Sequence, residues 1–194
     1  MKAKALAKAQ TEARAAMAKN WIAENGVLTG AADGGTIGSA KNYENFELIL
    51  DWKTEGEAAM GIRSIPQIAL GGKNSGALTG NMLHDNAAPK AAANGPQEWN
   101  TMQVKVVSDR VTVVLNGVTT AENVILENAC NREIPAYAEG QILLIAGNAP
   151  LNVREMYIRE LPATPRFELS EEEAADGFEV LFDGTSMHKW TGNT

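Results

Sequence analysis

The sequence predicts an all-β protein made of antiparallel sheet, with one helix at its N-terminus. Residues 46–53 (FELILDWK) alternate between apolar and polar side chains, as a strand with one buried face does. Residues 101–120 (TMQVKVVSDRVTVVLNGVTT) hold runs rich in β-branched residues, separated by turn-forming sequences. Residues 2–19 differ from both, because they are rich in Ala and contain neither Gly nor Pro, which is typical of a helix.

Shorter segments complete the predicted structure. In residues 20–30 the pair Asn25-Gly26 predicts a hairpin, because it readily adopts the positive φ angles of a two-residue turn. Residues 141–148 (QILLIAGN) and 151–161 (LNVREMYIREL) each predict one further strand. The acidic residues 170–176 indicate a linker with a short helix, because Ser170 and Glu173 have the spacing of a capping box.

The stretch of residues 43–70 carries most of the candidate functional side chains. It reads as two strands joined by a polar turn. In the first strand Glu47, Asp51 and Lys53 lie on the face opposite the apolar row, because side chains alternate along a strand. This charged row is the first candidate site.

The second strand of this stretch, residues 61–70 (GIRSIPQIAL), places Arg63 and Gln67 among apolar neighbours. An arginine among apolar side chains is uncommon and normally has a structural or functional role. Pro66 predicts an edge strand or a bulge, which is often found beside binding sites. We therefore expect Arg63 and Gln67 to join the charged row on one concave surface of a sandwich.

Composition and charge narrow the class of partner. The net charge of −7 argues against a nucleic-acid-binding surface, which requires clustered Lys and Arg. No apolar run is long enough to span a bilayer, and the N-terminal residues lack the apolar core of a signal peptide. The single cysteine, Cys130, excludes an internal disulfide. We expect a small ligand that is neutral or weakly charged.

Taken together, these segments resemble the 3-keto-disaccharide hydrolase-like family, whose members have a concanavalin A-like jelly-roll fold. The resemblance extends over about residues 2–161 and depends on the order of the blocks NWIAENGVLTG, YENFELILDWK, GIRSIPQI, EWNTMQVKVVSDRVTVVLNG, NVILEN and MYIREL. It implies a sandwich of two antiparallel sheets. It also implies a bacterial, periplasmic or secreted protein that has a carbohydrate ligand.

The same resemblance also implies how the chain is divided into domains and linkers. Family members commonly open with a strand of the form LF-(N/D)-G followed by Trp. We expect this strand to be missing ahead of residue 1, and its counterpart stands at Val180 to Trp190. We expect residues 178–182 to fill the vacant place in the sheet, in the same chain or in a strand-swapped oligomer. The expected parts are an N-terminal helix (1–20), a jelly-roll domain without its opening strand (21–162), a linker (163–177) and the opening strand of a second copy (178–194).

The resemblance also implies a chemistry, the cleavage of glycosides oxidised at C3 of the sugar. The C3 carbonyl acidifies the C2 hydrogen, so that a base can remove this proton and the group at C1 can leave. No cofactor is evident, and a divalent metal is left open. The candidate residues are, as base, Glu47 or Asp51; as groups that polarise the carbonyl, Lys53 and Arg63; and as substrate-binding residues, Gln67, His84 and Trp99.

Several of these residues also have a purely structural interpretation. The charged row could be a solvated face with cross-strand ion pairs. Trp99 could belong to the core together with Trp21 and Trp52, and His84 could be a hydrogen-bonded loop residue.

The chain also departs from the family pattern. Residues 144–148 (LIAGN) lack the Gln-x-His-Gly sequence of many relatives, and residues 69–72 (ALGG) replace the polar residues that usually follow PQI. Three functions therefore stay open. The first is a hydrolase or lyase of 3-keto-glycosides, the second a catalytically silent carbohydrate-binding module, and the third a scaffold domain for a second copy.

Overall fold

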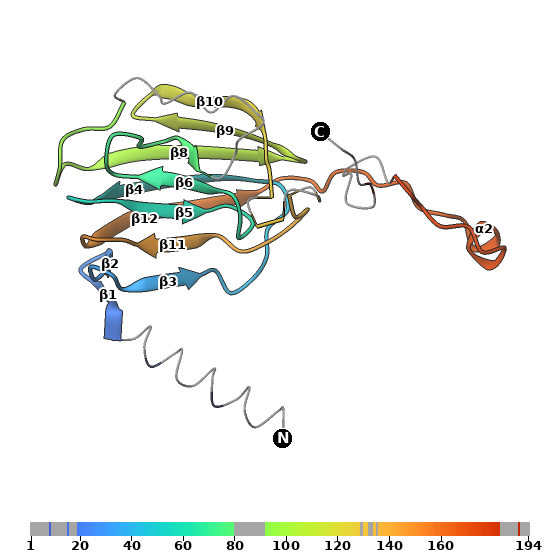
Figure 1. The fold of residues 1–194 in the computed structure, drawn as a ribbon, viewed down its shortest axis with the longest axis horizontal. Coiled ribbons are helices and arrows are strands. Elements are labelled where there is room, and N and C mark those ends of the chain that lie inside the picture. The colour runs from blue at the N-terminus through green and yellow to red at the C-terminus, as the bar shows by residue number, and fades with distance from the viewer. Residues whose placement is uncertain are drawn as a thin grey trace.

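The computed structural model of the protein describes residues 8, 15, 19–79, 92–128, 130, 131, 134, 136–182 and 190. Its body is a sandwich of two antiparallel sheets, which confirms the predicted all-β class (Figure 1). The helix expected over residues 2–19 lies almost wholly outside the described residues, and His84 lies outside them altogether. Within the described part of the chain, no helix is long and apolar enough to cross a membrane.

The larger sheet contains the longest strands, in the order β1-β2-β12-β4-β8-β9-β10. The hairpin predicted at Asn25 and Gly26 is confirmed, with φ angles of 51° and 77°. The strands are β1 (Trp21–Glu24), β2 (Val27–Gly30), β4 (Phe46–Lys53), β8 (Asn100–Val107), β9 (Arg110–Leu115), β10 (Val118–Ile125) and β12 (Leu151–Glu160).

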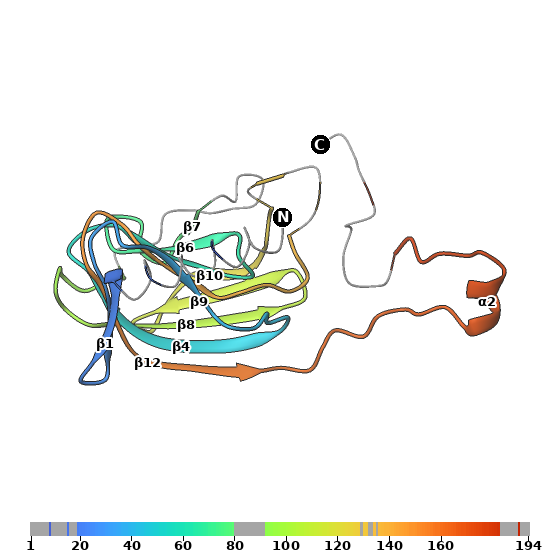
Figure 2. The ribbon, with the colours of Figure 1, turned by 90° about the horizontal axis from the view of Figure 1, so that it is seen from below.

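The smaller sheet packs against one face of the larger sheet, in the order β3-β11-β5-β6-β7. Figure 2 shows β4 and β12 curving around it, so that the free face of the larger sheet is its convex side. The strands are β3 (Gly35–Gly38), β5 (Ala58–Gly61), β6 (Gln67–Leu70), β7 (Leu78–Thr79) and β11 (Leu143–Ala146).

The core fills the space between the sheets, and β4 shows how the sequence directs side chains into it. Phe46, Leu48, Leu50 and Trp52 are each at most 1% exposed. Burying one large apolar side chain contributes about 1.5–3 kcal/mol. A one-residue slip of β4 would expose all four, so the alternation fixes which side chains face outward.

The segment of residues 61–70 differs from the single strand that the sequence predicts. It is interrupted after Gly61, and β5 and β6 pair with each other in the smaller sheet, not with β4. The turn between them contains Arg63 and Ser64, whose φ angles of 51° and 74° are incompatible with a strand. The two strands predicted in residues 43–70 therefore belong to opposite sheets.

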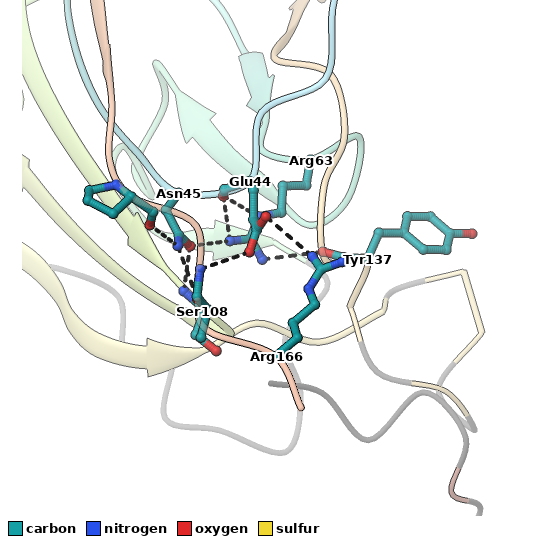
Figure 3. Close-up of polar contacts among 8 residues, drawn as sticks. Glu44, Asn45, Arg63, Ser108, Tyr137 and Arg166 are labelled. Atoms are coloured by element: carbon teal, nitrogen blue, oxygen red, sulfur yellow. Dashed lines mark hydrogen bonds and ion pairs between the residues drawn. The ribbon is translucent and has the colours of Figure 1, made fainter. Parts of the chain in front are cut away.

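Arg63 lies buried at one end of the sandwich, where its side chain holds two loops together (Figure 3). The guanidinium donates to the main-chain oxygen of Glu44 from Nε at 2.9 Å and from Nη2 at 2.5 Å, and to that of Tyr137 at 3.3 Å. Burial lowers the pKa of Arg63 to about 10, so the side chain stays protonated at neutral pH. We call Glu44, Asn45 and Arg63 the polar hub.

Asn45 connects the polar hub to two further parts of the chain, the β8–β9 turn and the residues that follow β12. Its side-chain oxygen accepts from the main-chain nitrogen of Ser108 at 2.8 Å and from Arg63 at 3.4 Å. Its amide nitrogen donates to the main-chain oxygen of Pro162 at 2.8 Å and to Oγ1 of Thr164 at 3.0 Å. The start of β4, the β8–β9 turn and the chain that leaves β12 are therefore fixed to one another.

The chain after β12 runs on past the end of the sandwich (Figures 1 and 2). Its short helix α2 (Glu171–Ala175) begins at the predicted capping box, in which Ser170 Oγ accepts from the main-chain nitrogen of Glu173. Residues 178–182 lie in no strand. That they fill a vacant place in a sheet stays a prediction.

Replacing Arg63 by Met should lower the free energy of unfolding by about 2–4 kcal/mol, because the main-chain oxygens of Glu44 and Tyr137 lose a buried donor. Urea unfolding measures this loss. The matched control is Arg166→Ala, which removes a half-exposed ion-pair partner of Glu44 at 3.3 Å and should cost less than ~1 kcal/mol. Equal losses in the two variants would contradict a framework role for Arg63.

Candidate functional site

The charged row of β4 lies on the free, convex face of the larger sheet. Glu47, Ile49, Asp51 and Lys53 alternate with the buried apolar row. The neighbouring strands β12 and β8 flank β4 on either side and supply partners for the charges. We call this surface the outer face.

At one end of the row, Glu47 lies between two cations. Arg159 on β12 and Lys105 on β8 are its cross-strand neighbours. Arg159 Nη2 contacts one carboxylate oxygen of Glu47, and Lys105 Nζ lies 3.4 Å from the other. The hydrogen bond from Arg159 lowers the pKa of the Glu47 carboxyl below its usual value. Glu47 is therefore a firmly ionised partner in a cross-strand ion pair.

At the other end of the row, Asp51 has both carboxylate oxygens occupied. Arg154 donates to Oδ2 from Nε at 3.2 Å and from Nη2 at 3.1 Å. Thr101 Oγ1 donates to Oδ1 at 2.7 Å. The Asp51 side chain is only 13% exposed, whereas that of Arg154 is 36% exposed. Asp51 thus fixes the orientation of Arg154, whose side chain remains partly exposed to solvent.

Trp99 stands next to this end of the row, directly before β8, and is half-buried. The guanidinium carbon of Arg154 lies 4.0 Å from the centre of its ring, and Lys53 Nζ lies 4.9 Å from it. These distances are typical of cation–π contacts. The core interpretation is confirmed for Trp21 and Trp52, which are 6% and 1% exposed, while Trp99 borders the outer face.

The sequence prediction missed Tyr157, which lies between the two charged ends of the outer face. It is 64% exposed and pairs across the strands with Ile49, which is 43% exposed. The register of β12 shifts between Arg154 and Tyr157, and Glu155 has a φ of 49°. This bulge places Arg154 and Tyr157 on the same face although they are three positions apart, which in a regular strand puts side chains on opposite faces. Strict alternation cannot reveal that arrangement.

The expected convergence of Glu47, Arg63 and Gln67 on one concave pocket is wrong. Glu47 lies on the convex outer face, Arg63 is buried in the polar hub, and Gln67 belongs to β6 in the smaller sheet. The physical reason is the turn of residues 54–57, which takes the chain from β4 into the smaller sheet before Arg63 and Gln67 are reached. The structure brings Glu47, Asp51, Lys53 and Trp99 onto or beside one face, and their individual roles stay predictions.

The contacts of the side chains on the outer face indicate which reactions or ligands this surface suits. A general base works best when its pKa lies near neutrality, and the ion pair moves Glu47 in the other direction. The face instead offers an open aromatic ring together with oriented donors and acceptors. Among the described residues, no three His, Cys, Asp or Glu side chains are grouped so that they could hold a metal ion.

Most of the chain matches the model of one protein family. Residues 5–159 match the model of a family described as 3-keto-alpha-glucoside-1,2-lyase-like domain. No curated protein matches the chain.

Solved structures with the same fold include two candidate glycosyl hydrolases from Parabacteroides distasonis ATCC 8503. They are 24% and 19% identical to this chain, with TM-scores of 0.59 and 0.57; both matches cover 74% of this chain, and 91% and 84% of the respective structures. The carbohydrate-binding module CBM66 from Bacillus subtilis is 15% identical, with a TM-score of 0.52, over 72% of this chain and 91% of that one. These similarities confirm the predicted jelly-roll sandwich.

The carboxyl of Glu47 should titrate below about 4.3, the usual pKa of an exposed glutamate, because Arg159 stabilises its ionised form. Replacing Arg159 by Gln should raise this pKa, which carbon-detected NMR of the carboxyl measures. Since the folded pKa lies below the unfolded one, the pair stabilises the protein above the unfolded pKa and loses this effect as the pH falls through the folded pKa. The variant should therefore lose stability less steeply in acid.

The control is Arg110→Gln, which removes an arginine that pairs with Asp109 at the β8–β9 turn. It should leave the titration of Glu47 unchanged. A Glu47 titration that is the same in wild type and in Arg159→Gln would rule out the ion pair as the cause.

Proposed function

Because the chain belongs to the family of 3-keto-alpha-glucoside-1,2-lyase-like domains, we propose that it is a carbohydrate-binding domain and that the outer face holds the sugar. The solved structures of similar fold support the ligand class, since they include candidate glycosyl hydrolases and a carbohydrate-binding module.

The observation that carries the proposal is the exposed ring of Tyr157 between two sets of fixed polar groups. A pyranose ring has apolar C–H faces and a rim of hydroxyl groups, so it suits an aromatic side chain flanked by donors and acceptors. Arg154 lies on one side of Tyr157 along β12, and Arg159 lies on the other. Asp51 and Glu47 hold these two arginines in place, which reduces the entropy lost when a hydroxyl binds.

The shape of the surface indicates what kind of carbohydrate it suits. The outer face is convex and open (Figure 2), so a sugar chain can lie across the strands without entering a pocket. Gln103 pairs with Ile49 on the side away from Tyr157 and adds a neutral donor and acceptor to the same row. We therefore favour a glycan chain over an isolated small sugar.

A second candidate function is the elimination reaction of 3-keto-glycosides, which the family description favours. In that case Asp51 or Glu47 would remove the C2 proton and Lys53 would polarise the C3 carbonyl. The contacts argue against it. Arg159 lowers the pKa of Glu47, which makes this carboxylate a weaker base, and hydrogen bonds from Arg154 and Thr101 occupy both carboxylate oxygens of Asp51. A scaffold role beside a second copy is the third candidate, and a periplasmic or secreted location stays a prediction.

Replacing Tyr157 by Ala should weaken glycan binding at least ~10-fold, because the ring supplies the apolar contact of the site. Native gels that contain soluble α-glucan, β-glucan or pectin measure binding as retardation of the protein. The matched control is Tyr137→Ala. Tyr137 is also exposed, at 48%, but it lies on the loop that Arg63 holds, outside the outer face, and its ring points away from the polar hub (Figure 3). This control should bind as the wild type does.

Incubation with a 3-keto-disaccharide separates the candidates. Glycan retardation without turnover above buffer supports the binding domain. Turnover that Asp51→Asn abolishes would establish the elimination reaction instead. Absence of retardation in every gel, together with absence of turnover, would favour the scaffold.

A further inference from the structure

One flank of β12 has no neighbouring strand along most of its length. β12 pairs with β4 from Asn152 to Glu160, but it pairs with β2 only from Leu151 to Val153. Beyond Val153, no strand among the described residues lies against this flank. An unpaired strand presents a row of free main-chain donors and acceptors and invites the addition of another strand.

The space beside this flank is hollow and lined in part by apolar groups. Where β2 leaves β12, a groove of about 330 Å³ opens between the β1–β2 hairpin and the β12 residues Val153 to Met156. Met156 is 38% exposed, and Ile158 is only partly covered although it packs against the core. The flank therefore exposes both main-chain groups and an apolar margin of the core.

The chain also carries a segment with the properties of a strand that is not in a sheet. Residues 178–182 (FEVLF) alternate so that Phe178, Val180 and Phe182 would share one face. Phe178 and Phe182 are 65% and 49% exposed, and Leu181 is 54% exposed. Large apolar side chains gathered in one exposed segment are typical of an interaction site.

We propose that this segment adds to the open flank of β12 in a second copy of the chain, and that the two copies exchange segments reciprocally. Its apolar face would cover Met156 and Ile158, and its main chain would pair with β12. The charges fit as well, because the alternation directs Glu179 to the side on which β12 carries Arg159. This inference does not depend on the proposed function.

A second copy fits better than the same chain because, within one chain, residues 178–182 lie in no strand and stay clear of the flank. The main-chain nitrogen of Leu161 bonds to Asn45 at 2.9 Å, Pro162 and Thr164 bond to the Asn45 side chain, and Arg166 pairs with Glu44. The tail is thus held in line with β12 where it leaves the body. After α2 the chain turns back toward the body, but residues 178–182 still lie beyond the end of the sandwich (Figures 1 and 2).

The test compares the full-length chain with its variant Phe178→Asp/Phe182→Asp in size-exclusion chromatography with light scattering. The wild type should have twice the monomer mass at high micromolar concentration, and the double variant should be monomeric with an unchanged far-UV spectrum. Phe167→Asp is the matched control, because Phe167 is 70% exposed in the same tail but lies outside the segment. It should remain a dimer.

Hydrogen exchange identifies the surface that is used. The amides of residues 155–160 should exchange at least ~10-fold more slowly in the wild-type dimer than in the double variant, and dilution to monomer should remove this protection. A monomeric wild type at high concentration would overturn the proposal. So would protection of these amides that persists on dilution, because it would place the segment on its own chain, and so would a dimer that the double variant retains.

Discussion

The buried guanidinium of Arg63 holds together the end of the sandwich on which the other features depend. It fixes the main-chain oxygen of Glu44, and the adjacent Asn45 then fixes the chain that leaves β12. β4 and β12 are the strands that carry the outer face, so their relative position there is set by buried hydrogen bonds as well as by sheet pairing. Burying such a charge is costly unless every donor finds an acceptor, which explains why main-chain carbonyls surround it.

The features that the sequence predicted well are local ones. The alternation in residues 46–53 directs four apolar side chains inward, and Asn25-Gly26 and Asn116-Gly117 adopt positive φ angles that suit hairpin turns. The prediction failed where the chain changes course. The turn of residues 54–57 moves the segment that contains Gln67 into the opposite sheet, and the bulge of β12 brings Tyr157 onto the outer face. Neither event has a signal in apolar periodicity.

Arg63 illustrates how a correct observation led to a wrong role. Arginine among apolar residues requires an acceptor for its charge, and a substrate carbonyl is the acceptor that the resemblance to the family predicts. The carbonyls that it binds are those of its own main chain, at Glu44 and Tyr137. Family membership supports a carbohydrate ligand, and our proposal places its site on the open outer face instead of on the concave surface that the sequence predicts.

The most direct measurement is NMR chemical-shift mapping of the labelled protein with the polysaccharide that causes the strongest gel retardation. We expect the amides of Tyr157, Arg154 and Gln103 to shift, while the signals of the Arg63 guanidinium and the Gln67 side-chain amide stay unchanged. Shifts that cluster around Gln67 on the smaller sheet, with the outer face unchanged, would contradict it.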